Sequence, residues 1–415
     1  MSPHLVPLKP ALYADCSCPK CGQGGPEPLG TVFPGVHVLG EYRCRACGYA
    51  FYRDLPVGFA VDNAVSIGKE DGSLHDADGA ESWVTTPLME GYHHPSGREW
   101  KIERKVYRAC KDIVLLNTLD FLYGHVLLKL WNAQYYLDHH RDKGLVLILP
   151  RSFEWLVPEG TAEVWLVDQR LGEAHGWYTC IDRFVQQRLK EYDTVSLGKG
   201  YAHPDKSLVD INRFCGVQPF PMEQFLERPK QVAFIWREDR LWFRSPFAKL
   251  AWRASNKLGL KPLVHKWFVA DQERLVRATW KKIKHALPDA EAMIVGLGRP
   301  STGHGAMEDL RRERMDKETE LEWCRAYARC QVVIGVHGSN MLLPTALAAG
   351  CIEVLPHDRF GNMVQDIAVR YHDLMQLFLY RFVDEFAPPA TVARHAIGMF
   401  RDFKVYYRDN KVNVP

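Results

Sequence analysis

The 415-residue sequence predicts an α/β fold of two Rossmann-like domains, preceded by a small cysteine-rich module. Two observations lead to this prediction. Short apolar runs alternate with helical segments in two separate parts of the chain, which is the pattern of doubly wound parallel sheets. In addition, five cysteines lie within the first 47 residues, in a segment rich in Gly and Pro.

The apolar runs divide the chain into segments. The runs that we expect to be buried strands are DIVLLN, GLVLILP and EVWLVD in the first domain, and QVAFIWR, AMIVGLG, QVVIGVHG and CIEVLP in the second. The predicted segments are residues 1–52, the cysteine-rich module; 53–218, the first Rossmann-like domain with a leading β segment; 219–372, the second; and 373–415, a tail that packs back on the first domain. The Pro-rich stretch PFPMEQFLERP is the expected linker.

Composition and charge are those of an ordinary globular protein. Hydrophobic residues make up 47% of the chain and charged residues 25%. A net charge of +3 is too near neutral to indicate nucleic-acid binding by itself. The most apolar stretch is interrupted by Asn117, Asp120 and His125, so we expect no transmembrane segment. Because no signal peptide is evident either, the predicted location is cytoplasmic, with peripheral attachment to a membrane as an alternative.

The cysteine-rich module contains two CxxC pairs, Cys18 with Cys21 and Cys44 with Cys47, and Gly follows each pair. This spacing presents four thiolates to one Zn²⁺. We therefore predict a zinc ribbon whose metal is structural, because a closed four-thiolate site has no open position for chemistry. A redox pair is the alternative interpretation. Cys16 is left over, and it can replace Cys18 as a ligand or stay free.

A second motif follows the apolar strand that ends at Gly335 or Val336. His337-Gly338-Ser339-Asn340 joins this strand to a helix, and Gly338 allows a tight turn. A helix N-terminus above a parallel sheet attracts pyrophosphate, so we predict that these four residues bind the phosphates of a nucleotide. The alternative is that Ser339 or Asn340 only caps the helix.

Other residues at strand ends extend this predicted nucleotide site. Glu353, on the following strand, is expected to hold ribose hydroxyls. Gly298 makes room for a nucleobase, and Arg299 beside it can reach a phosphate. Arg237 and Arg240 follow the strand VAFIW and are expected to neutralise a leaving diphosphate. For the strand-end Arg237, the alternative is a surface ion pair with Glu238 or Asp239.

Three blocks of sequence resemble the DUF563 (family 61) glycosyltransferases over roughly residues 55 to 375. The blocks are FLYGHVLL (121–128), AFIWREDR (233–240) and the segment from Glu320 to Pro356. Ser339-Asn340 stands where that family has Ala-Gly, and LWFRSPFAKLAWRASNKLGLKP after Arg240 reads as an insertion. The resemblance implies the two-domain GT-B fold and an inverting transfer from a nucleotide sugar without a catalytic metal.

The predicted function is therefore glycosyl transfer from a nucleotide-sugar donor on the second domain to a hydroxyl acceptor (glycan, lipid-linked or small-molecule) on the first. An inverting transfer needs a base for the acceptor hydroxyl. His125 and Asp120 follow the strand DIVLLN at the sheet edge that faces a crevice, and both are candidates. His125 is preferred because the family block includes it.

The stretch from Trp236 to Trp267 alternates basic and aromatic residues, and it leaves other interpretations open. A basic amphipathic helix can lie on an anionic membrane or contact a nucleic-acid backbone. Together with the zinc ribbon, this allows a sugar transferase that acts on modified DNA bases. A different class, a non-catalytic nucleotide-sugar-binding module recruited through its ribbon, also fits.

Overall fold

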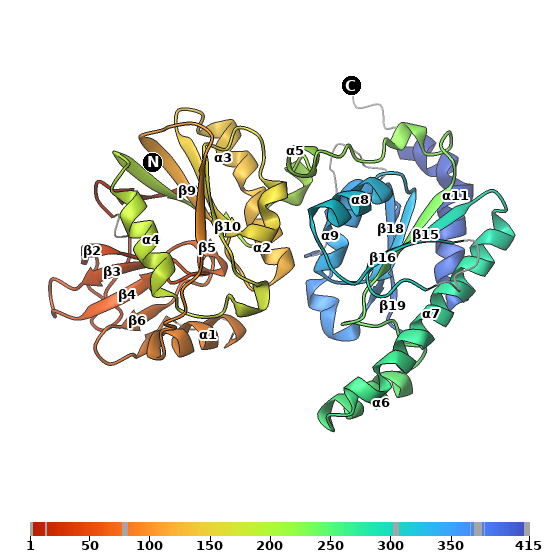
Figure 1. The fold of residues 1–415 in the computed structure, drawn as a ribbon, viewed down its shortest axis with the longest axis horizontal. Coiled ribbons are helices and arrows are strands. Elements are labelled where there is room, and N and C mark those ends of the chain that lie inside the picture. The colour runs from red at the N-terminus through yellow and green to blue at the C-terminus, as the bar shows by residue number, and fades with distance from the viewer. Residues whose placement is uncertain are drawn as a thin grey trace. The chain divides into compact units, whose positions relative to one another are not determined.

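The computed structural model describes residues 3–12, 15–76, 82–301, 307–365, 367, 368, 376 and 378–410. The chain divides into two compact units, Met1–Asp205 and Lys206–Pro415. Each unit has its own six-stranded sheet, which confirms the predicted α/β fold with two Rossmann-like sheets (Figure 1).

The sheet of the first unit has a parallel centre and antiparallel edges. Its strands, in spatial order, are β1 (Leu5–Lys9), β12 (Thr194–Gly198), β9 (Asp112–Asn117), β10 (Gly144–Pro150), β11 (Glu163–Val167) and β8 (Ile102–Val106). The four central strands pair in parallel, whereas β1 and β8 run antiparallel to their neighbours. Strand β10 is buried at every position, as expected for a continuous apolar run covered on both faces.

Helices follow the parallel strands of this unit. They are α2 (Tyr123–Trp131), α3 (Ala133–His139) and α4 (Thr179–Leu189), and α1 (Ser82–His93) precedes β8. The segment after β9 therefore contains two helices, α2 and α3, with Asn132 at their junction. Seven of the nine residues of α2 are buried, so this helix belongs to the core rather than to the surface.

The cysteine-rich module is part of a larger antiparallel sheet. The strands of that sheet are β2 (Glu27–Val32), β3 (Leu39–Arg43), β4 (Ala50–Asp54), β6 (Ser66–Gly68) and β7 (Leu74–His75). A short parallel pair, β5 (Val57–Gly58) with β13 (Gly200–Tyr201), links this region to the chain after β12. Cys18, Phe33 and Tyr42 share one hydrophobic core with Ile113 and Val195 of the Rossmann-like sheet. The cysteine-rich module is therefore packed into the first unit. The antiparallel sheet to which it belongs continues past residue 52, as far as β7.

The sheet of the second unit is parallel throughout. Its strands, in spatial order, are β16 (Met307–Arg312), β15 (Glu291–Leu297), β14 (Gln231–Trp236), β17 (Val332–Val336), β18 (Gly350–Leu355) and β19 (Tyr380–Asp384). Among the described residues, its helices are α5 (Asn212–Cys215), α6 (Pro246–Lys257), α7 (Lys261–Ala286), α8 (Lys317–Tyr327), α9 (Leu342–Leu347) and α11 (Pro389–Asn410). Strands β16 and β19 lie at the edges of the sheet, and their sequences, MEDLRR and YRFVD, do not predict strands because they lack an apolar run.

The C-terminal helix packs on the second unit, contrary to the predicted contact of the tail with the first domain. Helix α11 lies against α7, and Phe403 stacks on Phe225 with ring centroids 4.0 Å apart. Val392, Ala396 and Met399 belong to the same core as the strands of this unit. The physical reason is an apolar stripe at helical spacing along α11, which the aromatic and basic composition of the tail concealed.

Each of the two six-stranded sheets has a point where the strand order reverses. In the first unit the chain continues from β9 to β10 on one side, and β12 lies on the other. In the second unit β15 and β17 flank β14 in the same way. Crevices form outside the carboxyl ends of the strands at such points, and ligands bind there in open α/β sheets.

Candidate functional site

The four predicted zinc ligands lie together. The sulfur atoms of Cys18, Cys21, Cys44 and Cys47 are all within 4.8 Å of one another. Two of the distances are 3.7 Å, from Cys18 Sγ to Cys47 Sγ, and 3.5 Å, from Cys21 Sγ to Cys44 Sγ. A tetrahedral Zn²⁺ with Zn–S bonds of ~2.3 Å separates its sulfur ligands by ~3.8 Å. The donor set and its spacing therefore fit one four-thiolate metal ion.

The two CxxC turns have the same backbone geometry. Gly22 N donates to Cys18 O and Gly48 N to Cys44 O, both at 2.9 Å. Gly22 and Gly48 have φ values of 75° and 72°, in the region that favours glycine. Cys16 is half-buried and lies outside the four-thiol group, so the geometry selects Cys18 as the ligand.

The loop between β2 and β3 fastens the ribbon to the Rossmann-like sheet. Phe33 N donates to Asp182 Oδ1 (2.9 Å), and Asn117 Nδ2 at the end of β9 donates to Gly35 O (2.8 Å). Tyr178 N, just before α4, donates to Pro34 O at 2.8 Å. The ribbon loop is therefore held at the carboxyl edge of the first sheet.

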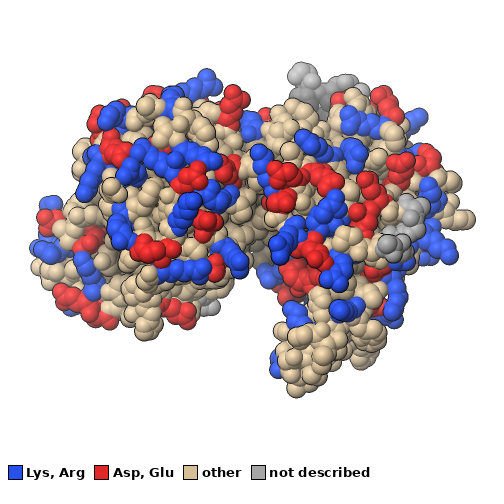
Figure 2. Space-filling view, in the orientation of Figure 1, with Lys and Arg blue, Asp and Glu red and all other residues tan. Residues whose placement is uncertain are grey.

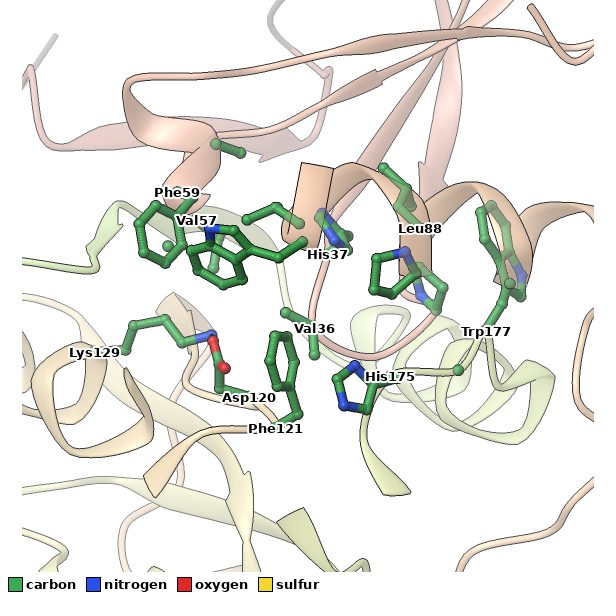
Figure 3. Close-up of a pocket in the computed structure, with 18 residues that line it drawn as sticks. Val36, His37, Val57, Phe59, Leu88, Asp120, Phe121, Lys129, His175 and Trp177 are labelled. Atoms are coloured by element: carbon green, nitrogen blue, oxygen red, sulfur yellow. The ribbon is translucent and has the colours of Figure 1, made fainter. Parts of the chain in front are cut away.

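A pocket of about 590 Å³, part of it open solvent, lies under this loop (Figure 3). Its wall combines the ribbon loop, α1, the loop after β9 and the segment before α4. The aromatic lining residues are Phe59, Trp83, Phe121 and Trp177, and the polar ones are His37, Asp120, Lys129 and His175. Aromatic faces with a few polar groups are typical of small-molecule sites.

Asp120 forms a buried cluster with Lys129 and His125. Lys129 Nζ lies 3.0 Å from Asp120 Oδ2, and His125 Nδ1 lies 3.3 Å from Asp120 Oδ1. Burial alone would raise the pKa of Asp120, but Lys129 and His125 lower that pKa well below its ordinary value. Asp120 is thus an ionised carboxylate at neutral pH and a poor proton acceptor, whereas it can orient the His125 ring through Nδ1 and leave Nε2 for another group.

Rings from the pocket wall, and the ring of His203, surround His125. The ring centroids of Phe59 and Trp83 lie 5.1 and 5.6 Å from that of His125, and His203, which follows β13, lies at 6.4 Å. His125 itself is not among the lining residues of the pocket, whereas Asp120 is. The structure therefore brings both predicted base candidates to the reversal point of the first sheet, with Asp120 on the pocket wall.

Lys129 and His37 are two polar residues of this pocket that the sequence did not single out. Lys129 is fully buried and donates to Leu119 O as well as to Asp120. A lysine inside the apolar run VLLKLW was the signal that could have revealed it. His37 lines the pocket, and its Nδ1 lies 2.7 Å from the buried Asp54 Oδ2. The 17-residue separation of His37 and Asp54 concealed this second His–Asp pair.

The predicted phosphate-binding residues of the second unit converge at its reversal point. Strands β14 and β17 pair in parallel, with Ile235 opposite Gly335, so the residues after each strand are neighbours. Arg240 Nη1 donates to His337 O at 2.6 Å, and Arg237 Nη1 donates to Asn340 Oδ1 at 2.6 Å. Two guanidinium groups therefore lie beside the His-Gly loop.

Gly338 allows this close approach. Its φ of 151° lies in the region that side chains disfavour. A Cβ at this position would meet Arg240 Nη1 at 2.8 Å and would also collide with Arg237 Nη1. Any larger residue would therefore push the guanidinium groups away from the loop.

The element after Gly338 is shorter than the helix that we predicted. Ser339 begins a 3-10 turn that ends at Met341, and α9 adds six residues. Ser339 and Asn340 are half-buried, and the N-cap position of this turn is Gly338, which has no side chain to cap it. Positive charge at this edge therefore comes from Arg237 and Arg240 rather than from a long helix dipole.

Glu353 occupies a different place from the predicted ribose contact. Its carboxylate is buried and hydrogen bonds His337 Nδ1 through Oε2, while Oε1 lies 3.8 Å from Cys351 Sγ. A carboxylate behind a buried imidazole sets the orientation of the ring. The geometry therefore favours a positioning role for Glu353.

Gly298 and Arg299 are not part of the arginine and His-Gly cluster. A Cβ on Gly298 would meet Trp236 Nε1 at 2.6 Å, so the Trp236 indole fills the space that we predicted for a nucleobase. Arg299 Nε donates to Glu313 Oε1 at 2.6 Å, and its side chain is 80% exposed. Arg299 is thus engaged in a surface ion pair. Arg237 also pairs with Asp239, as the alternative interpretation predicted, while its Nη1 reaches the His-Gly loop.

Comparisons with known proteins show no close relative. No protein-family model matches the chain, and no curated protein matches it. Among solved structures, the chain is similar to a protein described as a UDP-N-acetylglucosamine 2-epimerase from Listeria monocytogenes, with a TM-score of 0.29 and 10% identity. That match covers 71% of this chain and 66% of the other, just under two thirds of its length. A GtfA/B complex matches with a TM-score of 0.23 and 10% identity, over 94% of this chain and 76% of that one. Both scores are too low to bear on the activity.

Replacing Lys129 by Met tests the buried cluster, because it leaves the Asp120 carboxylate without its cation. We expect Lys129→Met to lower the free energy of unfolding of the first unit by about 3–5 kcal/mol at neutral pH. The double variant Lys129→Met/Asp120→Asn is expected to recover most of this loss. Urea titrations of the single and double variants measure both effects, and equal stability of the two would contradict the pairing.

The contribution of Asp120 to the free energy of unfolding is expected to depend on pH. The folded-state pKa of Asp120 is lowered, so its pairing stabilises the fold above the ordinary carboxyl range of ~4 and this contribution is lost as the pH falls. The stability difference between the wild type and Lys129→Met is therefore expected to narrow in acid.

Metal removal tests the four-thiol site. Since Cys18 and Cys44 belong to the core of the first unit, chelation is expected to lower the melting temperature of that unit. Cys18→Ser should abolish metal binding, whereas Cys16→Ser should retain it. Elemental analysis and thermal unfolding of both variants are the measurements, and loss of metal in Cys16→Ser would contradict the ligand assignment.

Proposed function

We propose that the chain is a glycosyltransferase that moves a sugar from a nucleotide-sugar donor to a hydroxyl acceptor. The observation that supports this most is the convergence of Arg237, Arg240 and the His337-Gly338 loop at the reversal point of the second sheet. Such a point is where open α/β sheets bind nucleotides, and a diphosphate needs positive charge there.

The donor diphosphate is proposed to bind against the two arginines. Arg237 is mostly buried, with 12% of its side chain exposed, and its guanidinium also pairs with Asp239, whose side chain is 72% exposed. The Asp239 carboxylate orients the Arg237 guanidinium. Because this carboxylate is exposed, a diphosphate, which carries more negative charge, can replace it as the partner of Arg237. Bidentate contact from a preorganised guanidinium stabilises a leaving diphosphate as its charge develops.

The acceptor is proposed to bind in the pocket of the first unit. Phe59, Trp83 and Phe121 offer faces for the apolar side of a sugar or another ring. The acceptor oxygen forms a bond to the anomeric carbon of the donor while the bond from that carbon to the diphosphate oxygen breaks. The diphosphate leaves with the electron pair, and the hydroxyl proton passes to an imidazole nitrogen.

His125 is the proposed base, with Asp120 as the residue that orients it. The lowered pKa of Asp120 supports this division, because a carboxylate that is hard to protonate keeps the ring oriented rather than accepting the proton. His37 is the alternative base, since it lines the pocket and pairs with Asp54. Inversion at the anomeric carbon and membership of family 61 remain predictions from the sequence resemblance.

Zinc is the proposed metal of the four-thiol site, because a closed set of four thiolates suits that ion. Its proposed contribution is indirect: the ion holds the ribbon, and the loop of the ribbon forms one wall of the acceptor pocket. Val36 and His37 in Figure 3 belong to this loop.

Donor binding can be tested with matched arginine variants. Arg237→Ala is expected to weaken binding of a nucleoside diphosphate by roughly 10- to 100-fold, which is the usual effect of losing a charged hydrogen bond. Arg299→Ala removes an arginine that pairs with Glu313 instead, so it should bind like the wild type. A thermal-shift screen of UDP, GDP, TDP and CMP sugars identifies the ligand, and calorimetry measures the variants. Equal weakening in both would contradict the proposed site.

The base can be tested by separate imidazole replacements. His125→Ala is expected to lower kcat by roughly 10²–10⁴-fold with little change in donor affinity, because general base catalysis contributes about that much. If His37→Ala has this effect and His125→Ala does not, the base is His37. Slow hydrolysis of the donor without acceptor separates an enzyme from a binding module, since tight binding without any turnover would contradict the proposed function.

A further inference from the structure

The hairpin of α6 and α7 exposes large apolar side chains to solvent. Helix α6 ends at Lys257, and Leu258-Gly259-Leu260 connects it to α7. The exposed apolar residues of this hairpin are Phe247 (83%), Leu250 (65%), Leu258 (71%), Leu260 (43%), Leu263 (80%) and Trp267 (67%). Single exposed apolar residues are normal on a protein surface, but six within 21 consecutive positions indicate an interaction surface.

These side chains form stripes at helical spacing. In α6, Phe247 and Leu250 lie three residues apart, and Ala251 and Ala254 are also exposed; Leu258 follows directly after the helix. The opposite side of α6 carries Ala248, Trp252 and the buried Ser255, of which the first two pack on Phe243 and Phe268. Leu260 precedes α7, and Leu263 and Trp267 in α7 follow it at intervals of three and four residues. The inner side of the hairpin is thus packed against apolar residues of the second unit. Its outer side carries a second apolar face that is exposed to solvent.

Positive charge accompanies this apolar surface. No Asp or Glu occurs from residue 240 to 270, and seven Lys or Arg do. Near the base of the hairpin, Arg244 pairs with Asp271 and Lys249 pairs with Glu385. Farther along, Arg253, Lys257 and Lys266 are exposed, and no described acidic side chain pairs with them. Figure 2 shows this end of the hairpin as tan surface with blue groups at its margin, and Figure 1 shows α6 lying away from the sheet.

The positive charge and the exposed apolar area of the hairpin together favour one kind of binding partner. A second copy of the chain docked on itself through this surface would bring Arg253, Lys257 and Lys266 against their own like charges. A nucleic-acid backbone would satisfy the cations but would leave the six large apolar side chains without a partner. An anionic lipid surface satisfies both, because phosphate headgroups lie directly above an apolar layer.

We propose that the α6–α7 hairpin inserts its apolar stripe into the headgroup region of an anionic membrane, with Arg253, Lys257 and Lys266 on lipid phosphates. Among the described residues, no helix is both long and apolar enough to cross a bilayer. With 12 residues, α6 is ~18 Å long and lies in the plane of the interface.

Membrane attachment through this hairpin would also hold the arginine cluster near the lipid surface. Gln272 Nε2 of α7 donates to Arg237 O at 3.0 Å, and Trp242 N donates to Gln272 Oε1 at 2.7 Å. His265 Nε2 lies 3.1 Å from Glu238 O. The base of the hairpin and the loop after β14 therefore form one hydrogen-bonded assembly. The attachment itself does not depend on the proposed transfer reaction.

Vesicle flotation of the full-length protein tests the proposal. The wild type is expected to float with vesicles of phosphatidylcholine and phosphatidylglycerol, and weakly or not at all with phosphatidylcholine alone. Phe247→Ser/Leu263→Ser should weaken binding at least about tenfold by removing apolar insertion, and Arg253→Glu/Lys257→Glu should do the same by removing charge attraction. Lys281→Glu/Lys282→Glu changes two exposed lysines at the other end of α7, so it is the matched control and should bind like the wild type.

A spectroscopic readout separates insertion from simple charge attraction. Trp267 fluorescence, obtained as the difference between the wild type and Trp267→Phe, is expected to shift to shorter wavelength on anionic vesicles. An unshifted Trp267, or full vesicle binding by Phe247→Ser/Leu263→Ser, would overturn the proposal. So would a wild type that binds duplex DNA but not vesicles, or one that forms a dimer in solution which this double variant dissociates. Unchanged thermal unfolding of each variant shows that its fold is intact.

Discussion

Parallel pairing of β14 with β17 is the constraint on which the charged edge of the second unit depends. It places Ile235 opposite Gly335, so the loops after the two strands meet although about 100 residues separate them. Arg237 and Arg240 then lie against the His337-Gly338 loop, and only glycine fits between them. Without that pairing the two arginines and the imidazole would be unrelated surface features. Every proposal about a nucleotide diphosphate rests on this local meeting of strand ends.

Both units contain a buried carboxylate that is paired with an imidazole. Asp120 is held by Lys129 and His125, and Glu353 is held by His337. In each case a carboxylate lies behind an imidazole and binds its Nδ1. A buried carboxylate with a partner is costly to move, so the ring it contacts keeps one orientation. This arrangement suits a site in which the imidazole, rather than the carboxylate, meets the ligand.

The ribbon contributes to the first unit through packing rather than through chemistry of its metal. Two of its thiol ligands, Cys18 and Cys44, share a core with the Rossmann-like strands, and its β2–β3 loop is hydrogen bonded to the end of β9 and to α4. A metal ion there would stabilise the pocket wall that includes Val36 and His37. The hairpin of α6 and α7 has a comparable position in the second unit, because Gln272 and His265 bind the loop that carries Arg237.

The metal-binding cysteines and the central strands of this protein could be predicted from its sequence. The CxxC spacing identified Cys18, Cys21, Cys44 and Cys47, and apolar runs located the central strands, because thiolate ligation and strand burial both leave short-range patterns. The same patterns placed His125, Asp120, Arg237 and His337 after strands. Tertiary structure alone decided the rest: that Lys129 neutralises Asp120, that Glu353 lies behind His337, that Trp236 fills the space beside Gly298, and that α11 packs on α7. These depend on contacts between residues distant in sequence or on the direction of a side chain, and neither follows from spacing along the chain.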